Sequence, residues 1–205
     1  MITQPSGDLL RLSTWWIEHR PRMERDIAWI HDPVDAAMAM SMVDQAIDSG
    51  ATVIALLTHG SDTPSRAVIS EHAKVPPTHV RDQPSEMSDI EWMREVSAIR
   101  DLRSALDLAD QLATIDAAAA ALTTARDRRT PVVFDGLAAH AGAMVAGTFD
   151  SSWLPASSSM DPAIEVAHEY WRVRPALDLQ LRGDGDFGLR AVFALMNVID
   201  DALEG

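Results

Sequence analysis

Apolar residues recur along this chain mainly at the spacing of amphipathic helices. Between residues 8 and 18 they form one broad helical stripe, and Asp8 stands in front of that stripe as a cap. A second helix is predicted from Asp32-Pro33 to Gly50, because an acid suits the cap and proline suits the first turn. The pattern therefore predicts a chain that begins with helices.

Three later regions continue the helical pattern. The capping-box sequence at residues 88–91 opens a long helical region that runs, with interruptions, to Arg126. Residues 136–147 carry small side chains at helical spacing, which lets a helix there lie close to its neighbours. A last apolar helix is predicted over about residues 188–203.

Short β-like runs separate these helices. Residues 52–57 form a continuous β-branched and aliphatic run, as expected of a buried parallel strand, and residues 131–134 form a second. Pro76-Pro77 allows at most a short third strand. Strands that alternate with helices indicate an α/β fold. We expect a small parallel sheet flanked by helices in a helix-rich, Rossmann-like three-layer arrangement.

The length of the chain limits the number of domains. With 205 residues it is long enough for one sizeable hydrophobic core and short for two. We expect a single domain over residues 1–205. Its N-terminal helix (about 8–18) and C-terminal helix (about 188–203) can pack together as a small helical subdomain.

Composition narrows the classes of function. A net charge of −14 argues against nucleic-acid binding, because phosphates would be repelled. The chain has no cysteine, which excludes disulfides and thiolate metal sites, and its histidines show no paired ligand spacing. We therefore expect neither a metal nor a cofactor. No apolar run reaches the roughly 20 residues that cross a bilayer, and the first residues lack a signal-peptide pattern, so we expect a cytoplasmic protein without membrane contact.

The stretch Pro175–Gly188 combines an apolar run, a glycine turn and a helix start. By itself, Gly183-x-Gly185-x-x-Gly188 matches the dinucleotide-binding fingerprint. A dinucleotide-binding unit needs a second parallel strand and an acid roughly 20 residues further on, whereas only one helix follows Gly188 in this sequence. The glycines are better interpreted together with the segments before them.

With those segments, this stretch resembles the C-terminal end of the nicotinate-nucleotide:dimethylbenzimidazole phosphoribosyltransferases. That family carries S-x-E-P, then E-P-L-L-D-L, then R-L-G-E-G-T-G, and residues 159–182 follow the same order without a gap. Residues 130–147 are similar to its V-P-V-L-L-D-G-F-I-S-x-A-A-A-L-x-A, with Asp135-Gly136 at the turn. Residues 4–12 are similar to K-P-P-G-S-L-G-R-L, and residues 50–67 to G-A-D-L-L-x-x-G-E-M-G-I-G-N-T-T-S-A-A.

The resemblance implies transfer of phosphoribose from nicotinate mononucleotide to an azole nitrogen of dimethylbenzimidazole, in the synthesis of the cobalamin lower ligand. Such a reaction needs phosphate donors, a dry base pocket and a carboxylate that takes the azole proton. The resemblance implies a homodimer. An ungapped match puts Gly185 at the position of the family's catalytic glutamate, whereas deleting one residue puts Asp184 there, and Asp184, one methylene shorter than glutamate, is the predicted catalytic base. The resemblance places substrate or phosphate binding at Gly60, Thr63, Ser65, Arg94, Asp135, Gly136, Ser159 and Gly183.

The phosphate-binding segment departs from the family pattern. Asp62 would repel a phosphate and Pro64 removes an amide donor, so residues 60–65 also fit a turn that caps a helix. Arg94 also fits an ion pair with a glutamate of its own helix. Asp184 also fits a turn or cap in front of the last helix.

Other family features are missing. The glycine-rich G-R-G-T-G reads R-D-Q-P-S at residues 81–85, the G-D-H-G-V segment is absent, and Ser157 and Ile164 replace two histidines. Two functions therefore stay open. The chain is an enzyme that binds a nucleotide-like small molecule, or a non-catalytic homologue that keeps the scaffold and acts as a binding or partner subunit. A second protein would then supply the missing part of the base pocket.

Overall fold

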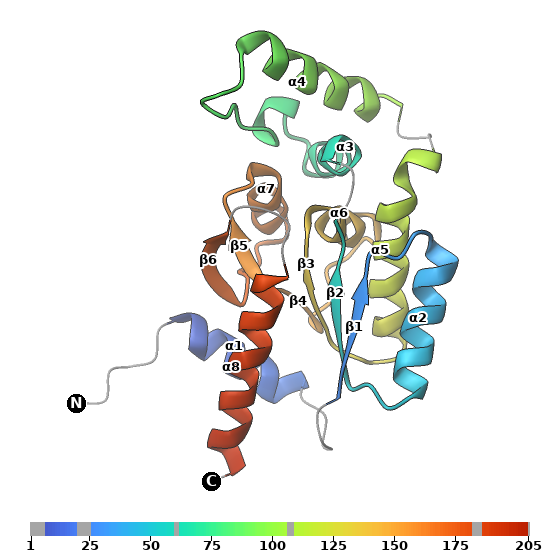
Figure 1. Cartoon of the computed structure of the whole chain (residues 1–205), viewed down its shortest axis with the longest axis vertical. Coiled ribbons are helices and arrows are strands. Elements are labelled where there is room, and N and C mark those ends of the chain that lie inside the picture. The colour runs from blue at the N-terminus through green and yellow to red at the C-terminus, as the bar shows by residue number, and fades with distance from the viewer. Residues whose placement is uncertain (1–6, 20–25, 60–61, 106–108, 182–185, 205) are drawn as a thin grey trace, which may run out of the picture.

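The protein is described by a computed structural model over residues 7–19, 26–59, 62–105, 109–181 and 186–204 (Figure 1). Its helices are α1 (Gly7–His19), α2 (Ala36–Asp48), α3 (Asp62–Ala73), α4 (Asp89–Arg103), α5 (Ala109–Asp127), α6 (Leu137–Val145), α7 (Pro162–Trp171) and α8 (Phe187–Glu204), with a 3-10 turn, η1 (Pro77–His79). Its strands are β1 (Ile27–His31), β2 (Val53–Leu57), β3 (Val132–Asp135), β4 (Trp153–Pro155), β5 (Ser157–Ser159) and β6 (Leu177–Leu181).

The strands form two parallel sheets. The larger has the order β1-β2-β3-β4, with Ile27 opposite Val53 and Ile54 opposite Val132. Every residue of β2 is buried, which explains its unbroken apolar run. The smaller sheet pairs β5 with β6. The two predicted strands are confirmed, whereas Pro77 begins a 3-10 turn instead of a third strand.

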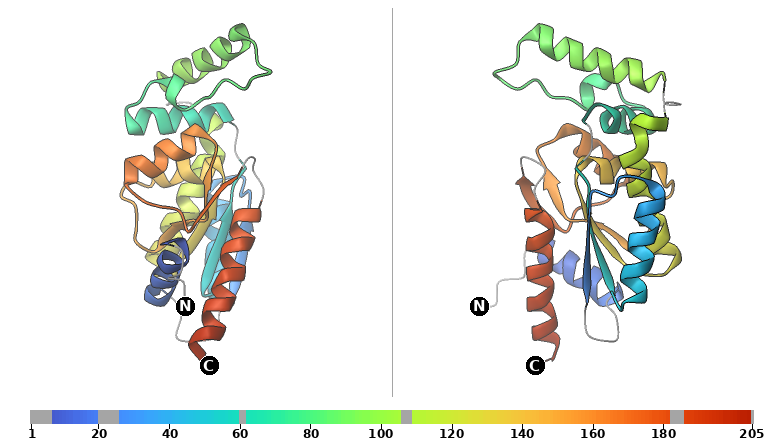
Figure 2. Two further views of the ribbon diagram at one scale, coloured as in Figure 1. Left: turned by 90° about the vertical axis from the view of Figure 1, so that its left-hand side faces the viewer. Right: turned by 45° about the vertical axis from the view of Figure 1, so that its right-hand side comes forward.

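Helices cover both faces of the larger sheet, so the predicted three-layer α/β fold is confirmed. Figures 1 and 2 show α2 and α5 on one face and α1 and α8 on the other. Because side chains alternate along a strand, Ile54 and Leu56 of β2 pack toward α2 and α5, while Val53 and Leu57 pack toward α1 and α8. A third buried cluster joins α3, α6 and α7 beside the sheet.

The first and last helices are tied to each other and to the sheet. The indole N–H of Trp16 donates to the Asp200 carboxylate at 2.6 Å, joining α1 to α8. Both helices share one buried cluster with β2 and β3. Within the part of the chain that the structure describes, no helix is long and apolar enough to cross a membrane.

The second helix begins later than predicted. Asp35, not Asp32, caps α2, and its carboxylate accepts from the Met38 N–H at 2.7 Å. Asp32 instead has a positive φ of 43° just after β1, so it cannot start a right-handed helix. Its carboxylate contacts His59 at the edge of the sheet.

The small residues of α6 allow close packing against α5. A Cβ built at Gly142 would lie 2.6 Å from the Ala118 Cβ and 2.8 Å from the Ala119 backbone nitrogen. We expect Gly142→Ala to lower the free energy of unfolding by about 1–3 kcal/mol through overpacking. Urea denaturation measures this change. Gly7→Ala is the control, because a Cβ built at Gly7 would lie 3.8 Å from the nearest heavy atom. An equally small loss of stability in both variants would contradict the close approach of α6 to α5.

Candidate functional site

The carboxyl ends of the strands of the larger sheet open toward α3 (Figure 1). In open parallel sheets this edge is where ligands bind, because the loops and helix N-termini meet there. Three short segments converge on it: residues 31–32 at the end of β1, residues 58–59 after β2, and residues 135–136 at the end of β3. The candidate site is built from these segments, from the start of α3 and from the ends of β5 and β6.

Asp32 and His59 connect the ends of β1 and β2. One carboxylate oxygen of Asp32 accepts from the backbone N–H of His59 at 2.6 Å, and the other lies 2.8 Å from its Nδ1. The side chains are 48% and 41% exposed, so the pair lies at the surface of the edge. The sequence places His59 at a strand end, but nothing in it shows that Asp32, 27 positions earlier, contacts this ring.

Asp135 ends β3, and Gly136 connects it to α6. Gly136 has a φ of 97°, and a Cβ there would lie 2.2 Å from the Thr58 carbonyl oxygen, so only glycine fits. The Gly136 N–H donates to Asp135 at 2.8 Å, and the Ser157 hydroxyl donates to the other carboxylate oxygen at 3.4 Å. The structure therefore joins the two residues of this motif to β2 and β5.

The Asp135 carboxylate also faces the last helix. A Cβ built at Gly188, in the first turn of α8, would lie 2.4 Å from Asp135 Oδ2 and 2.7 Å from Ser157 Oγ. An acid in front of a helix N-terminus is favourable. The Asp135 carboxylate thus lies against the first turn of α8. The last of the three glycines in the turn motif is required by this close approach.

Two buried hydroxyl groups near the start of α3 have no hydrogen-bond partner among the described residues. Thr58, just after β2, and Ser65, in the first turns of α3, are both fully buried. Thr63 lies half-buried in the first turn. Buried polar side chains almost always have a partner, so unpaired ones indicate a place where a ligand or water donates or accepts. Of these two hydroxyls, that of Ser65 belongs to the predicted phosphate-binding segment, and that of Thr58 lies just before it.

Arg66, which follows Ser65 in the chain, carries a buried charge. Arg66 is 4% exposed and contacts both carboxylate oxygens of Asp161, at 2.8 and 2.5 Å, and the Val80 carbonyl. Burial alone would lower the pKa of Arg66, but the hydrogen bond and charge of Asp161 outweigh it and raise the pKa. Asp62 lies 3.5 Å from the same guanidinium. The charge of Asp62, which the sequence predicts to repel phosphate, is thus partly neutralised.

Ser159 lines a pocket of about 380 Å³ at the ends of β5 and β6. Its hydroxyl accepts from the Asp161 N–H at 3.1 Å and donates to the Leu181 carbonyl at 3.3 Å. Among the described lining residues Arg81 is the cation, and it contacts Glu95 at 2.5 Å and Asp62 at 3.9 Å. The remaining lining residues are Asp82, Pro84, Met160, Asp161 and Leu181.

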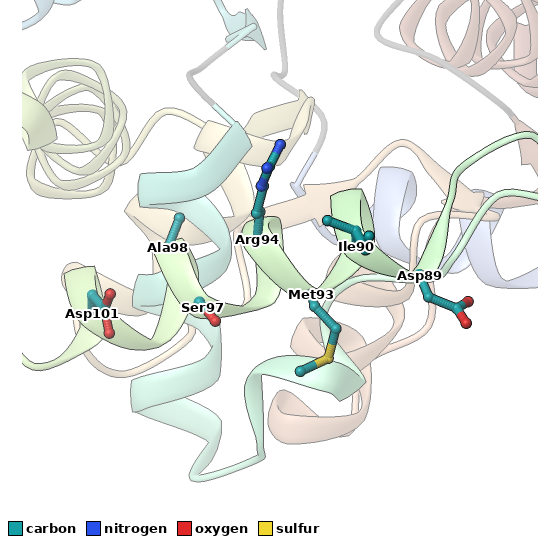
Figure 3. A pocket seen from close by; sticks show the side chains of 7 residues that line it. All are labelled: Asp89, Ile90, Met93, Arg94, Ser97, Ala98 and Asp101. Carbon is teal, nitrogen blue, oxygen red and sulfur yellow. The ribbon is translucent and has the colours of Figure 1, made fainter.

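Arg94 lies elsewhere. It is exposed on α4, in a surface pocket of about 560 Å³ whose lining residues all belong to that helix (Figure 3). Within the described ranges Arg94 makes no ion pair. Glu91 turns back to the capping residue Ser88, and Glu95 contacts Arg81. The structure does not place Arg94 in the pocket of Ser159, and the alternative of an ion pair within its own helix is not observed either.

A buried histidine pair links α6 and α7. The Nε2 atoms of His140 and His168 are 3.0 Å apart, and His140 Nδ1 lies 2.8 Å from the Gly136 carbonyl oxygen. Burial lowers the pKa of His140 to about 4, and burial and the adjacent His140 ring lower that of His168 to about 3. Both rings are therefore neutral near pH 7. Their 28-residue separation gives no ligand-like spacing in the sequence, and among the described residues no group of three or more histidines or acids could hold a metal.

Three of the predicted site residues, Gly60, Gly183 and Asp184, lie outside the described residues. The others fall into three places. Thr63 and Ser65 lie at the start of α3, with Asp135 and Gly136 at the adjoining strand ends. Ser159 lies in the pocket beside Arg81, and Arg94 lies apart on α4.

Comparison with known proteins places this architecture among the phosphoribosyltransferases. A family model described as a phosphoribosyltransferase matches residues 12–204. A nicotinate-nucleotide–dimethylbenzimidazole phosphoribosyltransferase of Corynebacterium efficiens is 29% identical over 180 residues, covering 80% of this chain and 49% of that protein. The enzyme of the same name from Mycobacterium ulcerans is 30% identical over 173 residues, covering 75% of this chain and 48% of that protein.

The solved structures agree on the fold. CobT from Thermus thermophilus superposes with a TM-score of 0.64 at 22% identity, covering 80% of this chain and 56% of that one. The matches to the Corynebacterium efficiens and Mycobacterium ulcerans proteins cover 49% and 48% of their lengths, so this chain spans about half the length of these relatives.

Proposed function

Because this chain belongs to the phosphoribosyltransferase family whose model matches residues 12–204, we propose that it transfers phosphoribose from nicotinate mononucleotide to a benzimidazole-type base. The observation that carries the proposal is the pair of buried, unpartnered hydroxyls of Thr58 and Ser65 where β2 leads into α3. A phosphate at a helix N-terminus receives backbone N–H groups, hydroxyls and the favourable end of the helix dipole. The names of the relatives supply the two substrates.

In this proposal the predicted residues divide by position. Gly60, Thr63 and Ser65 hold the phosphate, and Asp135 and Gly136 keep the ends of β2, β3 and α8 together around it. Ser159 contributes from the smaller sheet, and the role of Gly183 stays a sequence-based prediction. Asp184 stays the sequence-based prediction for the proton acceptor. The phosphate role of Arg94 also stays a prediction, because α4 carries it in a separate pocket.

A second candidate, a non-catalytic binding subunit, is favoured by the electrostatics of the edge. Among the described residues, the two arginines near the site already contact carboxylates: Arg66 binds Asp161, and Arg81 binds Glu95. A phosphate would have to share these cations. The chain also spans about half the length of its relatives, so a second protein completing the base pocket stays a prediction, as do the homodimer and the cytoplasmic location.

Isothermal titration calorimetry separates the two candidates at the binding step. The enzyme proposal expects nicotinate mononucleotide to bind, and to bind more weakly after Ser65→Ala. Loss of a hydrogen bond to a charged group costs roughly 1.5–3 kcal/mol, which is about 10-fold or more in Kd.

The same substitution is expected to leave folding nearly unchanged, because Ser65 Oγ has no partner among the described residues. Ser70→Ala is the control for binding: it also removes a buried hydroxyl of α3, but that hydroxyl already donates to the Val75 carbonyl at 2.7 Å, so the Kd for nicotinate mononucleotide is expected to stay unchanged. Equal Kd values for the wild type and Ser65→Ala would exclude the hydroxyl from the phosphate site. Absence of any binding would favour the non-catalytic candidate.

A further inference from the structure

The side of α4 that points away from the rest of the molecule carries exposed apolar side chains. Ile90 is 67% exposed and Met93 is 54% exposed, whereas Ile99, on the other side of the helix, is buried. Figures 1 and 2 show α4 at one end of the molecule, beyond α3. The exposed side forms the surface pocket of about 560 Å³ in Figure 3. We define the outer face of α4 by six of its lining residues: Ile90, Met93, Arg94, Ser97, Ala98 and Asp101.

The fold of the described chain does not account for the apolar residues of this face. A surface helix needs one apolar stripe, which packs on its own core. Ile99 and Leu102 form that stripe, in one cluster with residues of α3. Ile90 and Met93 lie outside the cluster. Exposed apolar side chains that gather on one face of a helix mark a surface for contact with another protein.

The same face carries one cation and one anion. Arg94 and Asp101 are seven positions apart, which is two helical turns, so both lie on the outer face but about 10 Å apart along the axis. They cannot pair with each other within one chain. Arg94 makes no ion pair with a described residue, and Asp101 lies 3.4 Å from the neighbouring Arg100. That contact is exposed on both sides and contributes little, so both charges can pair with another molecule.

The order of these residues makes the outer face complementary to itself. The midpoint between Arg94 and Asp101 falls between Ser97 and Ala98, about 5 Å along the axis from each charge. If a second copy of the helix runs antiparallel across this midpoint, Arg94 of each copy lies level with Asp101 of the other. The twofold symmetry forms this ion pair twice. The small Ser97 and Ala98 side chains let the two helices approach, because interaxial distance depends on the side chains at the contact.

We propose that the outer face of α4 binds a second copy of this chain, as an antiparallel helix pair with reciprocal contacts between Arg94 and Asp101. Ile90 and Met93 then become covered on either side of the axis. The 15-residue helix is about 22 Å long, which makes a small interface, so we expect a weak dimer with a Kd of about 1–100 μM. The inference concerns association and does not depend on the transfer reaction.

Sedimentation velocity of the full chain, over a range of concentrations at low salt, tests the interface by charge reversal. Arg94→Asp places two like-charge pairs across the axis and is expected to raise the Kd of the dimer at least about 10-fold. The double variant Arg94→Asp/Asp101→Arg restores opposite charges and is expected to bring the Kd back to within about threefold of wild type. This rescue needs two copies, because the two positions are too far apart to pair in one chain.

Arg174→Asp is the matched control, because it makes the same charge change at an exposed arginine outside α4, and it is expected to leave the Kd unchanged. Circular dichroism checks that each variant is folded. A wild type that stays monomeric at the highest soluble concentration overturns the proposal. So does a dimer with the same Kd in wild type and Arg94→Asp, or a double variant as weak as the single one. None of these results bears on the proposed function, which nicotinate release tests separately.

Discussion

Replacing Asp161 by Asn is expected to lower the free energy of unfolding by up to about 3–5 kcal/mol, because it leaves the buried Arg66 guanidinium with only the more distant Asp62 carboxylate, at 3.5 Å, as a charge partner. Arg66 is 4% exposed, and its two contacts with Asp161 are 2.8 and 2.5 Å long. Asn keeps an oxygen that can cap α7, where Asp161 accepts from the Ala163 N–H at 2.9 Å. The stability lost in Asp161→Asn therefore measures the contribution of the negative charge of Asp161. Urea denaturation at pH 7 measures it.

Two further variants make this result specific. Asp161→Ala also removes the cap and is expected to cost about 1 kcal/mol more than Asp161→Asn. Asp44→Ala removes one partner of the exposed Arg128 and is expected to change stability little, since surface ion pairs contribute little. An Asp161→Asn variant as stable as Asp44→Ala would show that Arg66 is not held by this carboxylate.

Lowering the pH from 7 to 5 is expected to cost roughly 2 kcal/mol of stability for each of His140 and His168. Their pKa values are lowered by burial from 6.5 to about 4 and about 3, so in this window the unfolded chain binds protons that the folded protein does not. The stability that the two neutral rings contribute is fully present above pH 6.5, and it is lost as the pH falls toward the pKa values that the rings have in the folded protein. Carboxylates with lowered pKa values stay ionised at about pH 5 and add little.

Urea unfolding at about pH 7, 6 and 5 measures this loss. His168→Gln is expected to flatten the dependence, because one titrating group is removed, and His79→Gln is expected to leave the slope unchanged. A free energy of unfolding that is the same at both ends of this range would show that the rings are not buried as neutral imidazoles. Acid sensitivity in this range would then need another source.

The parts of the fold that the sequence predicted are those with a local signal. β2 is an unbroken apolar run, β3 is apolar up to Phe134, and the cap of α4 at Ser88 is a complete capping box in the structure. β5 carries no such signal, since Ser157–Ser159 is polar and becomes a strand only by pairing with β6. A two-stranded pairing between segments so far apart in the chain cannot be inferred from propensity.

The residues of the candidate site also divide into those with a local sequence signal and those without one. The Asp135-Gly136 turn can be found because its motif is local, and its glycine is explained by the Thr58 carbonyl against it. Arg94 is predicted to bind phosphate only from its position in the motif, and in the structure it lies on α4, in a different pocket from Ser159. The pairs Asp32–His59 and His140–His168 leave no trace in the sequence because each joins residues 27 or 28 positions apart. Such contacts depend on which strands and helices become neighbours.

The measurement that tests the central claim most directly is nicotinate release from nicotinate mononucleotide, with and without dimethylbenzimidazole, by the purified full chain. The proposed function predicts release that depends on the base and that yields a ribosylated benzimidazole in equal amount. It also predicts that Ser65→Ala slows release at low nicotinate mononucleotide concentration while the protein stays folded. Binding of nicotinate mononucleotide without any release, or release that does not depend on the base, would contradict the claim that this chain is a transferase.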